Sequence, residues 1–358
     1  MTHHQRDPEQ QPIDYLWDRS GAPDPEIERL ESVLGEFRHD GAAIPTFPAS
    51  TSRTSLAWLP RFAAAATILL ALGVGSFFSL RLTGRRESGP AWNVAPLEGV
   101  PRIGSRSIAT GGSADKLYVG QTLSTNSSSR ATLSDSELGQ IQIDPDSRVR
   151  LLQIDPDHKR LQLQLGTIHA SIWAPPGEFT VDTPSATAID LGCAYTLHVA
   201  PDGSGTIRTT VGWVGFRLNG RESFIPAGAM CRTRPKLGPG TPYFEDATPA
   251  FRDALRTYDE SGQSSEAAAA ALRTVLTEAR ARDALTLWHL LSRSSAADRE
   301  KVYKRLAELV PPPPGVRRGA VLQLEPQALD LYWNAFDLGD ISLWRLYEQS
   351  SPSGNVSR

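Results

Sequence analysis

Alternation of apolar and polar residues dominates the middle of the chain. Apolar side chains occupy every second position in the runs 141–143, 161–165, 168–172, 195–199 and 214–218. A period of two is that of a β-strand with one buried face. Turn sequences rich in Gly, Pro and Asp separate these runs. The pattern predicts an all-β domain over residues 115–248, built as a sandwich, roll or solenoid of short strands.

The pentapeptide QIDPD occurs twice within this region, at 142–146 and 153–157. Four aspartates so close together raise the question of a metal site. Each Asp-Pro-Asp triplet is followed by basic residues, however, and these would repel a cation. Asp followed by Pro suits the first two positions of a type I turn. We therefore predict two turns between strands, and no metal.

From residue 249 the apolar spacing becomes that of helices. Apolar residues recur three and four positions apart in 272–279, 302–310 and 329–336, and 282–294 is a further helical stretch. Ser295, with Asp298 three residues later, is a predicted N-terminal cap, and the prolines of 311–314 prevent continuation of that helix. The pattern predicts a small bundle of four or five helices over residues 249–350.

Residues 62–80 form an uncharged, strongly apolar segment between two arginines. At 1.5 Å rise per residue it spans about 28 Å, close to the thickness of a bilayer's hydrocarbon core. We predict a single transmembrane helix within 58–82, with a buried core helix as the alternative. Two arginines precede the span and three follow it, which does not decide orientation. The position of both cysteines after the span favours a cytoplasmic N-terminus and an exported C-terminal part.

Residues 1–57 are predicted to hold a short helical hairpin and a linker. Asp24 followed by Pro25 is a helix start, and apolar residues at helical spacing follow it. A hairpin of this size is too small to be stable alone. Its apolar face is therefore predicted to contact a cytoplasmic partner, through Tyr15, Leu16, Trp17, Leu30, Leu34 and Phe37. The alternative is a tail that rests on the membrane surface. Residues 83–114 are predicted to be a second linker.

Composition narrows the function. The chain has 37 basic and 40 acidic residues, a net charge of −3, and no basic stripe interleaved with aromatics, so no nucleic-acid partner is expected. No phosphate-binding glycine loop is present, and the histidines lack a nucleophile partner, so we predict neither an enzyme nor a cofactor.

Cys193 and Cys231 cannot build a zinc site alone; they either form a disulfide or lie buried separately. Trp173, Trp213 and Trp288 are candidates for a sugar-binding face or for the core.

The β region resembles the FecR family domain. The resemblance is carried by "YVGQTLSTNSSSRATLSDSELGQIQIDPDSRVRLL", "RLQLQLGTIHASIW", "GEFTVDTPSATAIDLGCAYTLHV" and "TTVGWVGF". The positions that match the family's spaced glycines and apolar residues are Gly120, Thr125, Ala131, Leu133, Ile143, Val149, Leu165, Gly166, Phe179, Val181, Thr183, Gly192, Tyr195, Val199, Val211, Gly212 and Val214. Cys193 stands where the family pattern usually has threonine after this glycine.

The order of parts is also similar to that family: a short helical segment, one membrane span and then the β domain. FecR-like proteins transmit an extracytoplasmic signal, often from an outer-membrane receptor, to a sigma factor at the inner face. The resemblance thus implies a single-pass regulator of the bacterial inner membrane, with its large part in the periplasm. Related anti-sigma modules often bind zinc through a His-x3-Cys-x2-Cys motif, whereas residues 1–57 contain no cysteine. The alternative function is an envelope scaffold whose β domain binds a protein or a glycan, with no role in transcription.

Overall fold

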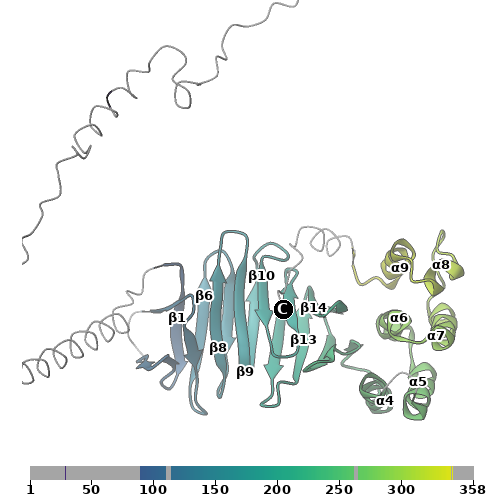
Figure 1. The fold of residues 1–358 in the computed structure, drawn as a ribbon, viewed down its shortest axis with the longest axis horizontal. Coiled ribbons are helices and arrows are strands. Elements are labelled where there is room, and N and C mark those ends of the chain that lie inside the picture. The colour runs from purple at the N-terminus through teal and green to yellow at the C-terminus, as the bar shows by residue number, and fades with distance from the viewer. Residues whose placement is uncertain (1–28, 30–88, 110–113, 262–264, 340, 342–358) are drawn as a thin grey trace, which may run out of the picture. The chain divides into compact units, whose positions relative to one another are not determined.

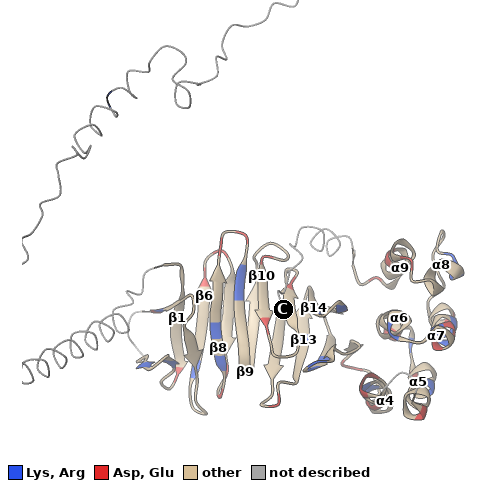
Figure 2. Ribbon diagram, in the orientation of Figure 1, with Lys and Arg blue, Asp and Glu red and all other residues tan. Residues whose placement is uncertain are grey.

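The computed structural model describes residues 29, 89–109, 114–261, 265–339 and 341. Strands up to residue 244 are followed by helices from residue 249 (Figure 1), which confirms the predicted all-β region and helical C-terminal part. Both belong to one compact unit, Arg85–Arg358. Figure 2 shows basic and acidic residues interspersed along the described strands and helices.

The predicted membrane span, 58–82, and the six N-terminal contact residues lie outside the described residues, of which only Arg29 belongs to the N-terminal part. In the part of the chain that the structure does describe, no helix has the length and apolar character needed to cross a bilayer.

The strands form two sheets that share one long strand. Sheet A has the order β4-β1-β6-β7-β9-β12-β13-β16, with β17 and β18 both paired to β16. Its strands are β1 (Ala91–Glu98), β4 (Asp115–Tyr118), β6 (Arg130–Asp135), β7 (Gly139–Ile143), β9 (Lys159–Ile172), β12 (Ala194–Val199), β13 (Gly205–Val211), β16 (Ala229–Arg234), β17 (Gly238–Pro239) and β18 (Tyr243–Phe244).

Sheet B has the order β3-β2-β5-β8-β9-β10-β11-β14-β15. Its further strands are β2 (Arg102–Ile103), β3 (Arg106–Ser107), β5 (Thr122–Ser124), β8 (Arg148–Ile154), β10 (Phe179–Asp182), β11 (Thr187–Asp190), β14 (Trp213–Leu218) and β15 (Arg221–Pro226). Among these pairs only β9–β10 is parallel. The rings of Trp92 in sheet A and Phe179 in sheet B lie 6.1 Å apart and are both buried, so the two sheets face each other across a common core.

Strand β9 passes from sheet B to sheet A at Gly166. Residues before Gly166 pair with β8 and β10, and residues from Gly166 onward pair with β7 and β12. The buried positions accordingly change from odd numbers (Leu161, Leu163) to even numbers (Ile168, Ala170). The apolar runs 161–165 and 168–172, which look separate in the sequence, are thus one bent strand whose buried positions shift by one residue at the bend.

The bend depends on glycine at position 166. Its φ of 92° is in the left-handed region. A methyl group there would lie 2.5 Å from Ser147 Cα and overlap the Ser147 hydroxyl. That hydroxyl accepts a hydrogen bond from Thr167 N at 2.9 Å, and Thr125 Oγ1 accepts one from Ser147 N at 2.9 Å. The turn that joins β7 to β8 is thereby held against the bend.

Gly166→Ala is expected to destabilise the protein by about 2 kcal/mol more than Gly120→Ala. Both glycines have positive φ, 92° and 87°, so both substitutions carry the same backbone strain. Space around Gly120 is open, whereas Gly166 contacts Ser147. Urea unfolding of the two variants measures the difference. Equal destabilisation would show that Ser147 moves aside without cost.

The Asp-Pro-Asp triplets of both repeats lie in the connections between strands, as predicted. Residues 144–146 connect β7 to β8, and residues 155–157 connect β8 to β9. Asp146, at the third position of the first turn, has a φ of 54°, whereas a type I turn requires a negative φ at this position, so the predicted type I turn is wrong there. In the second turn the backbones of Asp155 and His158 exchange hydrogen bonds. No group of three or more potential metal ligands occurs among the described residues.

The predicted linker over 83–114 is wrong between residues 91 and 107, which form β1, β2 and β3. Strand β1 pairs with β4 and β6 and buries Trp92 and Val94. Its alternation is short because the register shifts between Pro96 and Glu98. Glycine and proline around so brief a pattern resemble a linker, and pairing with β4 and β6 makes the segment a strand.

The helices begin at Pro249, where the sequence predicted the change. They are α4 (Pro249–Glu260), α5 (Glu266–Glu278), α6 (Ala284–Arg293), α7 (Ala296–Leu309), α8 (Arg318–Leu322) and α9 (Pro326–Trp333), with 3-10 turns at Ala281–Asp283 and Asn334–Phe336. The Ser295 side chain accepts a hydrogen bond from Asp298 N and caps α7, as predicted. That helix ends at Leu309, before the four prolines.

Helix α6 packs against β15 of the β domain. The neutral ring of His289 accepts a hydrogen bond from Phe224 N at Nε2 (3.0 Å) and lies 2.8 Å from Leu285 O through Nδ1. Burial holds the pKa of this imidazole well below its usual value. Around it, the rings of Phe224, Trp288 and Trp333 lie within 5.0–6.2 Å of their neighbours. The helices therefore share a continuous core with the β domain.

Candidate functional site

The two cysteines are free, buried thiols at different places in the sheets. Leu197, Ile207 and Cys231 lie next to one another across β12, β13 and β16. Cys193 precedes Leu197 by four residues, which is about 13 Å of strand. The Cα atoms of a disulfide lie within about 7 Å of each other. This register therefore excludes a disulfide between Cys193 and Cys231, and the second alternative, two separately buried cysteines, applies.

Each thiol has its own partners. Cys231 Sγ donates to Gly240 O at 3.1 Å, and its pKa is raised to about 12 by burial. Cys193 Sγ donates to Asp190 Oδ2 at 2.6 Å, and burial together with this carboxylate raises its pKa. Raised thiol pKa values mean that neither sulfur is a ready nucleophile.

The three tryptophans do not share one face. Trp173, at the end of β9, is 62 % exposed, and its Nε1 donates to Ser136 O. Trp288 is buried, and Trp213 is partly buried; their rings lie 5.1 and 6.3 Å from that of Trp333. Two of the three thus belong to the contact between β domain and helices, so these three tryptophans do not form a common sugar-binding face.

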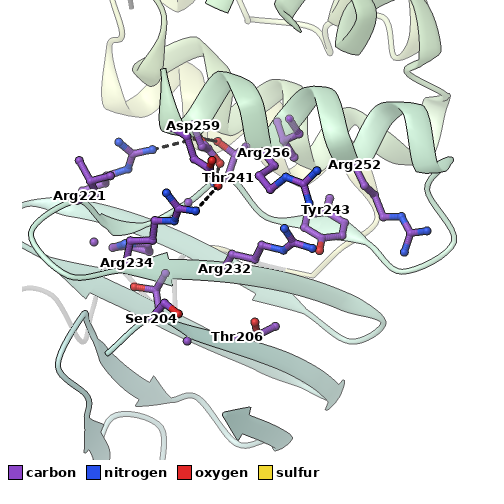
Figure 3. A pocket seen from close by; sticks show the side chains of 18 residues that line it. Ser204, Thr206, Arg221, Arg232, Arg234, Thr241, Tyr243, Arg252, Arg256 and Asp259 are labelled. Carbon is purple, nitrogen blue, oxygen red and sulfur yellow. Dashed lines mark hydrogen bonds and ion pairs between the residues drawn. The ribbon is translucent and has the colours of Figure 1, made fainter. Parts of the chain in front are cut away.

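A pocket of about 260 Å³ lies between the β16 end of sheet A and helix α4 (Figure 3). Sequence reasoning did not single out its charged residues. Five arginines line it: Arg221 from β15, Arg232 and Arg234 from β16, and Arg252 and Arg256 from α4. Spacing within each element explains why two arginines of β16 and two of α4 face the same pocket, because residues two apart on a strand and four apart on a helix point to the same side.

Only two carboxylates line the same pocket, Asp259 and Glu260. Both are engaged by neighbouring residues. Asp259 pairs with Arg221 at 3.2 Å and accepts hydrogen bonds from Thr241 N at 2.6 Å and Thr241 Oγ1 at 2.8 Å. Glu260 pairs with Arg234 at 2.8 Å. The lining itself therefore holds five basic and two acidic residues.

The sequence contains two pairs of these arginines at regular spacing, but neither pair by itself indicates a pocket. "CRTR" at 231–234 places two arginines on one face of a strand, and Arg252 and Arg256 are spaced by one helical turn. Neither pair reveals that the other lies opposite it. The segment between β17 and β18 supplies Thr241, and β18 supplies Tyr243, to the lining of the same pocket.

The described residues from 91 to 244 form a two-sheet β domain, and no group of three or more potential metal ligands occurs among the described residues. Residues 121–212 match the family model described as FecR protein. This match confirms the resemblance to the FecR domain that the spaced glycines and apolar residues of the β region carry.

The solved structures that this chain matches include two crystal structures, at 1.65 and 2.50 Å, of a protein from Parabacteroides distasonis that is described as a candidate anti-sigma factor. In both cases the identity is 14 %, the TM-score is 0.31, and the match covers 38 % of this chain and 64 % of that chain. The chain therefore spans less than two thirds of that protein's length. No curated protein matches this chain.

Proposed function

We propose that this protein is a membrane-tethered regulator that carries a signal from its FecR domain to a cytoplasmic sigma factor. The membrane anchor is the apolar segment 62–80, with residues 1–57 in the cytoplasm and the β domain with its helices in the periplasm of a bacterium. The observation that carries the proposal is the FecR domain at residues 121–212, placed after one apolar segment in the order typical of such regulators.

Orientation is tested with a reporter fused after residue 358. Alkaline phosphatase, which is active only when exported, is expected to be active at that position, and a fluorescent protein that requires the cytoplasm is expected to be dark. The opposite pair of results would place the FecR domain in the cytoplasm and contradict the proposal.

The cytoplasmic partner is tested by substitution on the predicted helix. Leu34→Asp introduces a charge into the apolar contact face, whereas Ser32→Asp introduces the same charge on the opposite face of that helix. A sigma factor is expected to co-purify with the full chain from its native host, to be retained by Ser32→Asp and to be lost with Leu34→Asp, with roughly a tenfold reduction or more in recovery. Transcription from promoters of that sigma factor should change in the same variants.

The envelope-scaffold function predicts a different outcome. In that case no sigma factor is recovered with the full chain, and Leu34→Asp changes no transcript. Exposed Trp173 at the end of β9 is the described residue best suited to contact a protein or glycan in such a role.

A further inference from the structure

The pocket between β16 and α4 has cations that no neighbouring carboxylate neutralises. Arg221 and Arg234 form ion pairs with the two acidic residues of the lining, and Arg256 pairs with Asp253 at 2.8 Å on its own helix. No ion pair to Arg232 or Arg252 occurs among the described residues. Figure 3 shows Arg232 extending from the strand and Arg252 lying on the helix side.

Two arginines of the pocket lining also have hydrogen-bond donors without a partner among the described residues. The Nε atoms of Arg221 and Arg252 are buried and have no hydrogen-bond partner in the part of the chain that the structure describes. Buried donors in native proteins nearly always have one. The pocket also includes the phenol of Tyr243 and the hydroxyl of Thr206.

We propose that this pocket binds a phosphate monoester, with the phosphate between Arg232 and Arg252. All five cations of the lining are arginines, whose planar forks match the oxygens of phosphate. Arg232 and Arg252 together carry two positive charges that no carboxylate of the described residues pairs with, which suits a dianion better than a single carboxylate. The organic part of the ester has an apolar surface available, because Leu237, Pro239 and Leu255 line the same cavity.

The position of the pocket gives binding a structural consequence. Strand β16 belongs to the β domain and α4 is the first helix after it, and each contributes two of the arginines. A bound dianion would neutralise repulsion between these cations and link the two elements. If the proposed regulatory function holds, this pocket is the site at which the periplasmic signal is read.

The test uses the purified full chain in detergent, titrated by calorimetry with inorganic phosphate and with glycerol 3-phosphate, and mixed with phosphatidylcholine vesicles that contain or lack phosphatidic acid. The variant is Arg232→Gln/Arg252→Gln. The matched control is Arg273→Gln/Arg317→Gln, which removes the same charge from α5 and from the residue before α8, at exposed positions outside the pocket. Circular dichroism verifies that all three proteins are folded.

Saturable binding of glycerol 3-phosphate to wild type is expected, with affinity about tenfold or more lower in Arg232→Gln/Arg252→Gln and unchanged in the control. Binding of phosphatidic acid vesicles but not of the free ester, with the same dependence on Arg232 and Arg252, would support the site and assign the phosphate to a lipid. Absence of saturable binding of all three phosphate probes, or equal weakening in both double variants, would overturn the proposal.

The regulatory function and the phosphate-binding pocket can be contradicted independently of each other. Binding that depends on the pocket while Leu34→Asp leaves every transcript unchanged retains the ligand site and rejects the regulator. Loss of a sigma factor with Leu34→Asp, together with no phosphate binding, retains the regulator and rejects the ligand.

Discussion

Arg293→Ala is expected to lower the free energy of unfolding by about 3–5 kcal/mol. Arg293 is only 8 % exposed and extends from α6 to the β domain. It donates hydrogen bonds to Thr241 Oγ1 at 2.9 Å, Ser223 Oγ at 2.7 Å and Glu222 O. Burial, with the neighbouring Arg221 charge, lowers its pKa to about 10, so it remains a cation at neutral pH. Its removal leaves a cavity and several acceptors without their donor.

Urea titrations followed by tryptophan fluorescence measure this effect, since Trp288 and Trp333 lie in the contact between α6 and the β domain. Arg293→Lys keeps the charge but not the planar fork, so it is expected to lose an intermediate amount. Exposed Arg273→Ala on α5 should change stability by less than about 0.5 kcal/mol. A loss below about 1 kcal/mol for Arg293→Ala would show that the helices do not depend on this residue for their attachment.

Asp190→Asn is expected to stabilise the protein by up to about 3 kcal/mol at pH 7.5. Asp190 ends β11 and is 1 % exposed. Burial raises the pKa of its carboxyl to about 6, although Cys193 Sγ (2.6 Å) and Gly192 N (2.8 Å) both donate to it. The folded state therefore favours the protonated acid. Its stabilising contribution is complete below the unfolded pKa, near 3.8, and is lost as the pH rises through about 6.

The dependence on pH separates this cause from a change in packing. The advantage of Asp190→Asn over wild type should fall to about half at pH 5, where the wild-type carboxyl is mostly protonated in the folded state. Exposed Asp157→Asn is the control and should have little effect at either pH. Destabilisation by Asp190→Asn at pH 7.5 would mean that the ionised carboxylate is a better partner for Cys193 and Gly192 than an amide is.

Much of the fold follows from periodicity. Strand positions such as Leu161, Leu197 and Phe216 are buried at a spacing of two because one face of each strand contacts the opposite sheet. The start of the helices at Pro249 and the cap at Ser295 follow from equally local chemistry. Strand β1 was not predicted because its alternation is interrupted after Pro96 and because pairing with β4 and β6, which the sequence does not show, makes it a strand.

The candidate site could not be predicted in the same way. Arg232 and Arg252 are ordinary surface residues until β16 and α4 are placed against each other, and their charge becomes unusual only when the pairs formed by Asp259 and Glu260 are known. The cysteines show the converse. The sequence allows a disulfide between Cys193 and Cys231. The strand register excludes this bond, because it places Cys231 beside Ile207.

The sequence alone determined the kind of elements, their order and the family of the β domain, because these depend on spacing along the chain. Only the tertiary structure decided which residues meet: the bend of β9 against Ser147, the separation of the two thiols and the five arginines around one pocket. Register and packing bring together residues that are distant in the chain, and a contact between two faces is a property of neither face by itself.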